Sequence, residues 1–82
     1  MVTQKTSLDD LFNIVTTTLP DVAAGEIFIV KDLFRGFEWN RIEKGKRRRL
    51  GSMVFTWANN KGSSVIQPLD KTPQNQQRYQ KL

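Results

Sequence analysis

The chain has 82 residues, 38% of them hydrophobic, so we expect residues 1–82 to form one small domain with a single core. It contains no Cys and no His, which excludes disulfides, metal sites built from thiolate or imidazole groups, and catalysis by either side chain. The net charge of +5 comes from residues 44–82, which carry nine basic side chains and one acidic one, so this half is expected to face a polyanion.

The first predicted elements are a helix at residues 7–19 and a strand at residues 26–30. Ser7 and Asp10 resemble a capping box, and apolar side chains then recur three and four residues apart until Pro20 ends the helix. The strand is a short run of β-branched and aromatic residues. No stretch of the chain is apolar enough for a signal peptide or a membrane span, so we expect a cytoplasmic protein with no membrane contact.

A second helical unit is predicted at residues 31–42, with a break at Gly36, followed by a basic helix at residues 45–60. The basic helix carries an apolar stripe at i, i+3, i+4, i+7 and i+8, formed by Leu50, Met53, Val54, Trp57 and Ala58. Two helices joined by a short polar link, the second one basic, are typical of a helix-turn-helix. Trp39 and Trp57 lie on the apolar periods of their helices, so we expect them in the core rather than stacked on bases.

The face of the basic helix opposite the stripe carries Arg48, Ser52, Phe55 and Asn59. Lys46 and Arg47 point nearer the stripe and are expected to reach past the end of the core. Phe55 faces away from the stripe, so it either packs under the C-terminal hairpin or lies in a dimer interface, with base stacking as a third alternative. Gly51 costs roughly 1 kcal/mol relative to Ala inside a helix, which suggests that another backbone, from the second helical unit or from DNA, comes close to it.

Residues 64–81 are predicted to form a two-stranded ribbon. Pro68 restricts its first strand to a sheet edge, Pro73 lies in a polar turn, and Tyr79 of the second strand can cover the core. The alternative is that this Gln-rich and Asn-rich segment is a disordered polar terminus. If the ribbon forms, the order of elements predicts an α+β fold, namely a winged helix-turn-helix with three helices, a small antiparallel sheet and a C-terminal β-wing. In that fold the early strand can pair with the hairpin.

The basic cluster from Lys44 to Arg49 opens the basic helix, where its charge adds to the positive end of the helix dipole and favours a phosphate group. A solvated helix start is the alternative explanation for such a charge run. Arg48 or Arg49 can also reach a guanine edge, and the amide groups of the ribbon suit base edges. We therefore expect the helix and the wing to be comparably able to recognise DNA bases. The predicted DNA-binding residues are Lys44, Lys46, Arg47, Arg48, Arg49, Ser52, Lys61, Lys71, Thr72, Gln74, Asn75, Gln76 and Arg78.

Three segments carry a family resemblance, and they read KDLFRGFEWNRI at residues 31–42, RRRLGSMVF at residues 47–55 and VIQPLDKTPQNQQRY at residues 65–79. They resemble the small winged helix-turn-helix proteins of Gram-positive bacteria and conjugative plasmids, among them relaxosome accessory factors. The resemblance implies a homodimer that binds double-stranded DNA at a plasmid origin of transfer and works with a relaxase or another relaxosome protein. It implies no nuclease activity.

We therefore expect a sequence-specific double-stranded DNA-binding protein that is not an enzyme and needs no cofactor or metal. The carboxylate pairs Asp9 with Asp10 and Glu38 with Glu43 are explained by helix caps and solvated faces rather than by acid and base catalysis. The alternatives are a small transcriptional regulator, a basic module that binds an acidic protein partner, and an RNA-binding protein.

Overall fold

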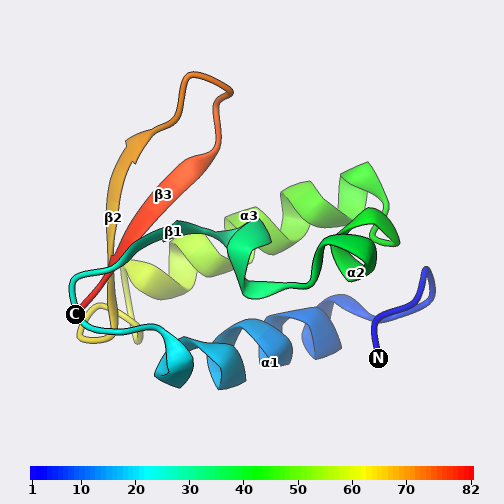
Figure 1. The fold of residues 1–82 in the computed structure, drawn as a ribbon, viewed down its shortest axis with the longest axis horizontal. Helices are drawn as coiled ribbons and strands as arrows, with labels where there is room; N and C mark the ends of the chain where they lie inside the picture. The colour runs from blue at the N-terminus through cyan, green and yellow to red at the C-terminus, as the bar shows by residue number, and fades with distance from the viewer.

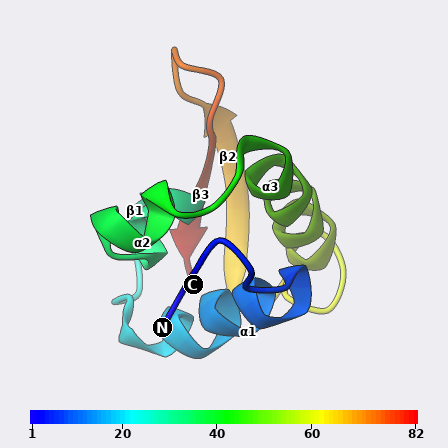
Figure 2. The ribbon, with the colours of Figure 1, turned by 90° about the vertical axis from the view of Figure 1, so that its right-hand side faces the viewer.

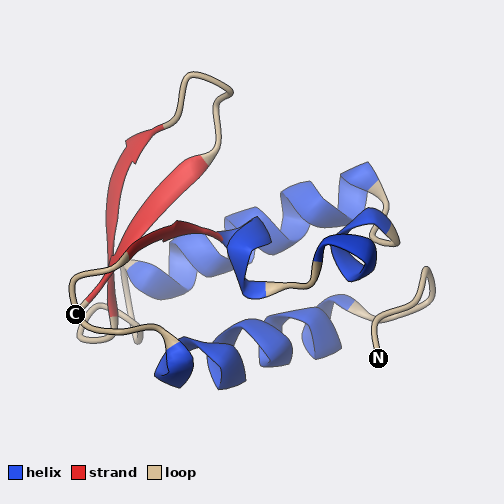
Figure 3. Cartoon of the chain, viewed as in Figure 1, coloured by secondary structure: helices blue, strands red, loops and turns tan.

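The computed structural model describes residues 1–82 and shows three helices packed with a three-stranded antiparallel sheet that ends in a C-terminal hairpin (Figures 1 and 3). This arrangement confirms the expected α+β class and is consistent with a winged helix. None of the helices combines the length and the apolar character that crossing a membrane requires. The elements are α1 (Leu8–Thr18), η1 (Leu19–Asp21), β1 (Ile27–Ile29), η2 (Val30–Leu33), α2 (Gly36–Asn40), α3 (Lys44–Ala58), β2 (Ile66–Lys71) and β3 (Gln77–Lys81).

Helix α1 begins after Ser7, whose Oγ accepts a hydrogen bond from the backbone N–H of Asp10 at 3.1 Å. This bond satisfies one of the free N–H groups at the helix start, so the expected N-cap is present. Leu11 and Val15 are buried on the inner face of α1. The helix ends at Thr18, where the chain tightens into the 3₁₀ turn η1 that contains Pro20. The predicted helix at residues 7–19 therefore differs from α1 by one residue at each end.

The sheet has the order β1-β3-β2, so the last strand lies in the middle. Strand β1 pairs with β3 with Phe28 opposite Tyr79, and β2 pairs with β3 across the C-terminal hairpin. The early strand thus joins the hairpin, as the order of elements predicted. Pro68 lies in the edge strand β2, where its missing N–H breaks no ladder between two neighbours. Strand β1 ends at Ile29, because Val30 already starts the 3₁₀ turn η2.

The predicted helical unit at residues 31–42 consists of two short pieces, and its break lies one residue earlier than expected. Phe34 and Arg35 have extended backbones with ψ near 150°, and Gly36 is the first residue of α2 rather than the interruption. Helix α2 has only five residues. The N-terminal segment holds this helix in place. The N–H of Val2 donates to Glu38 Oε2 at 2.9 Å, and Arg41 donates to the carbonyl of Val2 at 2.9 Å.

Helix α3 runs from Lys44 to Ala58 and supplies the core through Leu50, Val54 and Ala58, all buried. Trp57 is partly buried against this core and meets the ring of Phe12 edge-on, with centroids 6.0 Å apart. In Figure 2, α1 lies below, α2 and α3 lie on either side, and the hairpin rises beyond them. The buried residues form one cluster, made of Val2, Leu11, Val15, Leu19, Phe28, Val30, Leu33, Ile42, Leu50, Val54, Ala58, Ile66 and Tyr79.

Candidate functional site

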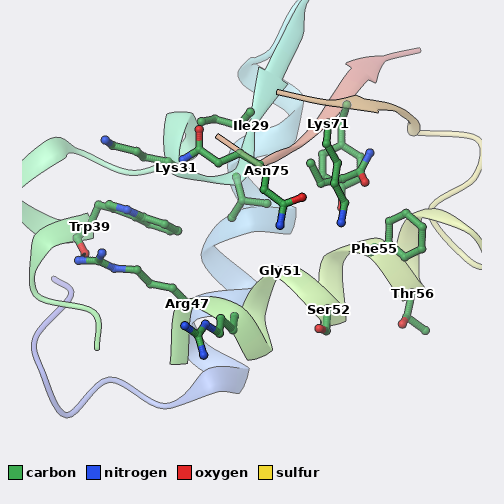
Figure 4. Close-up of a pocket in the computed structure, with 15 residues that line it drawn as sticks. Ile29, Lys31, Trp39, Arg47, Gly51, Ser52, Phe55, Thr56, Lys71 and Asn75 are labelled. Carbon is green, nitrogen blue, oxygen red and sulfur yellow. Dashed lines mark hydrogen bonds between the residues drawn. The ribbon is translucent and has the colours of Figure 1, made fainter. Parts of the chain in front are cut away.

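An open groove of about 680 Å³ lies between α3 and the C-terminal hairpin (Figure 4), and we call it the helix–hairpin groove. The α3 wall consists of Arg47, Arg48, Gly51, Ser52, Phe55 and Thr56. The hairpin wall consists of Lys71, Asn75, Gln76 and Gln77. The floor between them consists of Ile29, Val30, Lys31, Trp39 and Tyr79. Two regions that are distant in sequence therefore face each other across one concave surface.

The charge of the helix–hairpin groove is entirely positive. Lys31, Arg47, Arg48 and Lys71 line it, and none of its lining residues is Asp or Glu. Cations gathered in a concave surface reinforce one another's field and raise the local concentration of anions. The groove is therefore suited to a negatively charged ligand.

Lys46 and Arg47 form contacts within the chain itself. Lys46 Nζ donates to the carbonyl of Thr6 at 3.0 Å, which ties α3 to the N-terminal segment. Arg47 donates from NH2 to the carbonyl of Trp39 at 3.0 Å, and its guanidinium lies 5.3 Å from the centroid of the Trp39 ring. Both side chains lie toward the core side of α3, as the helix period predicted. Their charge remains in place, but their first role is to hold α2 and the N-terminal segment against α3.

The other predicted DNA-binding residues of α3 divide between the groove and the surface around it. Arg48 and Ser52 are exposed and line the groove. Lys44 and Arg49 are exposed outside it. Lys61 lies at a second, mostly apolar hollow beside Phe12, Met53 and Trp57. The structure therefore brings together only part of the basic cluster.

The turn of the hairpin is organised by Thr72. Its N–H donates to the carbonyl of Gln76 at 2.8 Å, its carbonyl accepts from the N–H of Asn75 at 2.8 Å, and its Oγ1 accepts from the N–H of Gln76 at 3.1 Å. Asn75 has a φ of 65°, a left-handed conformation that Asn adopts more readily than most residues. Asn75 and Gln76 thereby reach the groove, and Gln74 is exposed in the same turn.

Arg78 and Gln77 brace the hairpin across its two strands. Arg78 Nε donates to the carbonyl of Asp70 at 2.9 Å, so this predicted DNA-binding residue holds β2 to β3. The amide of Gln77 donates to the carbonyls of Leu69 and Arg78. These bonds stiffen the segment that carries Lys71 on the opposite strand. The ribbon is thus an ordered hairpin and not the disordered terminus that its composition allowed.

Tyr79 contributes to the floor of the groove. It is fully buried, and its ring stacks on Phe28 with centroids 5.9 Å apart. Its hydroxyl group has no hydrogen-bond partner, and burial raises the pKa of this phenol to about 12. The side chain therefore stays neutral at every physiological pH and contributes packing rather than charge.

Gly51 has open space around it, which corrects one sequence-based expectation. A methyl group at this position would meet no atom outside its own helix within 4 Å, so the second helical unit does not approach it. Gly62 is the glycine that has a close neighbour, namely the ring of Trp57. A methyl carbon there would lie 2.5 Å from Cδ2 and Cε3 of Trp57. The second helical unit was therefore wrong as the neighbour of Gly51, and the close approach of DNA stays a prediction. The crowding at Gly62 depends on the fold of the loop after α3, which decides where the Trp57 ring lies.

Lys31, Phe55 and Thr56 also line the groove, although the list of predicted DNA-binding residues omits them. The exposed fraction of Phe55 is 44%, so the hairpin does not cover it. The helix period predicted that Phe55 faces away from the core, and this prediction is enough to place it on the exposed side of α3. No pattern in the neighbouring sequence indicates that Lys31 lines the groove, because its place on the floor depends on the pairing of β1 with β3.

A sequence-family model described as a domain of unknown function (DUF1413) matches residues 13–81. Comparison with curated proteins and with solved structures finds no match. The matched segment includes the whole helix–hairpin groove and leaves out residues 1–12, among them the first part of α1, and Leu82.

Proposed function

We propose that this chain, which belongs to the family DUF1413 of domains of unknown function, is a sequence-specific double-stranded DNA-binding protein. The observation that carries the proposal is the helix–hairpin groove, which has four cations, no acidic residue, and hydrogen-bonding side chains on both walls. Phosphate groups would provide the partner for the cations, and base edges would provide the partner for the amide and hydroxyl groups. A winged helix presents its third helix and its hairpin in this manner.

The α3 wall suits the major groove of B-DNA. Arg48, Ser52 and Thr56 lie four residues apart, so they form one row along the exposed side of a 15-residue helix. The major groove is about 12 Å wide and admits an α-helix. In this arrangement the guanidinium of Arg48 is the group able to make a bidentate contact with a guanine, and the two hydroxyl groups contact neighbouring edges.

The hairpin wall suits the DNA backbone beside the helix. Figure 4 shows Lys71 and Asn75 reaching from the hairpin toward the α3 side of the groove. A lysine at this place neutralises a phosphate without reading sequence. Gln74 and Asn75 in the turn extend the contact toward the adjacent minor groove, where a ribbon can enter. The hairpin would then fix the register in which α3 reads the bases.

A narrower role follows from the family resemblance, and we propose it as such. The three segments similar to relaxosome accessory factors contribute η2 with α2, the first part of α3, and the hairpin, which together build the groove. The role is therefore that of a homodimer that binds a plasmid origin of transfer and assists a relaxase. A small transcriptional regulator uses the same contacts at a promoter, and it is the second candidate.

The decisive experiment is a salt titration of affinity for three ligands of equal length. These are a duplex selected from a random pool by binding to the protein, a random duplex, and an RNA duplex. We expect the selected duplex to bind most tightly, and the logarithm of its association constant to fall linearly with the logarithm of salt concentration. Equal affinity for all three would remove sequence specificity from the proposal. Absence of binding at low salt would favour a module that binds an acidic protein.

The position of the selected sequence on the replicon that encodes the chain separates the two DNA-binding roles. A match beside the nick site of a relaxase supports a relaxosome accessory factor. A match that overlaps a promoter replaces that role with transcriptional regulation. Mass measurement of the complex in solution tests the homodimer, because a dimer requires two copies on one duplex with two half-sites.

A further inference from the structure

Phe55 is a large apolar side chain that lies outside the core of this fold. It remains 44% exposed, stays outside the core cluster and forms no aromatic pair, whereas Phe12, Phe28 and Phe34 each pack against another ring. A single exposed apolar residue is common on protein surfaces. This one differs in its place, because it lines the helix–hairpin groove, whose charged side chains are all cations.

A second copy of the chain is a poor occupant for this site. Two copies that met through the same groove would bring two positively charged surfaces together, each with Lys31, Arg48 and Lys71. Like charges placed together in an interface cost several kcal/mol. The partner of Phe55 is therefore an anionic molecule that also offers an apolar group. A symmetric dimer through this groove is electrostatically unfavourable, so we place Phe55 against an anionic partner instead of a second copy of the chain.

The proposed DNA-binding function limits what the ring of Phe55 can contact. Bases in a duplex are stacked, so a side chain on a helix in the major groove meets their edges and not their faces. The C5-methyl group of thymine is the only alkyl group on those edges, and it projects farther into the major groove than the C–H groups of cytosine and of the purines. A phenyl ring has no hydrogen-bonding group, so the thymine methyl group is its best complement there.

We infer that Phe55 is a specificity-determining residue that contacts a thymine C5-methyl group in the major groove. The inference rests on the proposed function. Ser52 and Thr56 flank Phe55 on α3, and their hydroxyl groups are available to the edges of the neighbouring bases. The protein should accordingly prefer sites with a thymine at the position that faces the C-terminal half of α3, about three base pairs from the position read by Arg48, since Phe55 follows Arg48 by seven residues, a rise of about 10 Å along the helix.

Substitution of deoxyuridine for thymine tests this contact directly, because the two bases differ only by the methyl group and pair identically. Each thymine of the selected duplex is replaced singly, and affinity is measured for the wild type, Phe55→Ala and Phe55→Leu. We expect one replacement to weaken wild-type binding by about fourfold, the loss that corresponds to one buried methyl group. Phe55→Ala should bind both duplexes equally, and Phe55→Leu should retain part of the difference.

Phe37→Ala is the matched control. Phe37 is similarly exposed, at 49%, but it lies on α2 outside the groove, so this variant should keep the fourfold difference. Circular dichroism of each variant verifies that the fold is retained. If wild type binds the selected duplex and no deoxyuridine replacement matters, the inference is wrong while the DNA-binding function stands. A loss that persists in Phe55→Ala assigns the methyl contact to another residue. Tighter binding of single strands indicates base stacking instead, and a failure to select any duplex removes both proposals.

Discussion

Tyr79 shows how one residue serves both the core and the site. Its ring is fully buried against Phe28, while its hydroxyl group lies at the groove floor without a hydrogen-bond partner. An unpaired buried hydroxyl costs free energy, whereas the buried ring stabilises the fold through its apolar area. The ring is therefore the reason for an aromatic residue here, and the hydroxyl group is tolerated.

The first prediction concerns the titration of Tyr79, the only tyrosine of the chain. Because burial raises its pKa from 10.0 to about 12, the folded state holds the proton more tightly than the unfolded state. The associated stability is complete below pH 10 and is lost as the pH rises through about 12. The ultraviolet absorbance of the phenolate measures this pKa without interference from another tyrosine.

Tyr79→Phe is the control for that titration, because it keeps the ring and removes the ionisable group. Its free energy of unfolding should fall less between pH 10 and pH 12 than that of the wild type. At neutral pH it should be at least as stable as the wild type, since no hydrogen bond is lost. A phenol that titrates at its ordinary pKa in the folded protein would show that water reaches the hydroxyl group.

The second prediction compares two glycines with opposite surroundings. Gly62→Ala would push a methyl group against the Trp57 ring, so we expect it to lower the free energy of unfolding by about 1–3 kcal/mol. Gly51→Ala meets open space inside a helix and should raise the free energy of unfolding by about 1 kcal/mol. Urea denaturation of the two variants measures both changes. Equal effects at both sites would contradict the placement of the Trp57 ring.

At the scale of elements, α3 divides its surface between three tasks. Leu50, Val54 and Ala58 face the core, and Arg47 reaches across to the carbonyl of Trp39 on α2. Arg48 faces the groove, together with Ser52 and Thr56, which follow it in one row along the helix. The period of the helix separates these faces by about 100° per residue, so adjacent arginines acquire different roles. The basic cluster therefore does not form one patch. Lys46 and Arg47 bind carbonyl groups within the chain, Arg48 is exposed in the groove, and Lys44 and Arg49 are exposed outside it.

The third prediction uses that division within the cluster. Arg48→Ala removes a cation that lines the groove, and Arg49→Ala removes an equally charged neighbour that lies outside it. Lys71→Ala should reduce the salt slope of DNA binding by about 0.9, because this lysine is proposed to meet a phosphate, and Arg48→Ala should weaken binding of the selected duplex through loss of its guanine contact. Arg49→Ala should change the slope less. An equal or larger effect of Arg49→Ala would move the interface to the other side of α3.

At the scale of the whole molecule, β3 connects the two halves of the chain. It is the central strand, paired with β1 on one side and with β2 on the other, and it buries Tyr79 in the core. The acidic first half and the basic second half therefore fold as partners around one cluster of buried residues. The N-terminal segment completes this cluster through Val2, which is also buried.

The fourth prediction tests this dependence by removing residues 64–82. The shortened chain loses Ile66 and Tyr79 from the core and leaves β1 without a strand to pair with. A small domain has little stability to spare, so we expect the shortened chain to show no cooperative unfolding transition. Circular dichroism during urea denaturation provides the measurement. A retained cooperative transition would mean that the helices fold without the hairpin.

Much of the fold was predictable because its signals are local. The capping residue Ser7, the apolar period of α3 and the edge strand marked by Pro68 each act within a few neighbouring residues, and each appears in the structure as expected. The break before α2 was displaced by one residue, since five helical residues are too few for a period to define. The positions of Arg48, Phe55 and Lys71 on an outward face followed from the same local rules.

By itself, the sequence determined the kinds of element, their order and the excess of positive charge in the second half. Only the tertiary structure decided which cations act together. Lys46 and Arg47 are bound to carbonyl groups of distant residues, and Lys31 enters the groove because β1 pairs with β3. The physical reason is the distance along the chain over which each feature is decided. Helix and turn preferences depend on neighbouring residues, whereas a concave charged surface depends on distant segments that the core brings together.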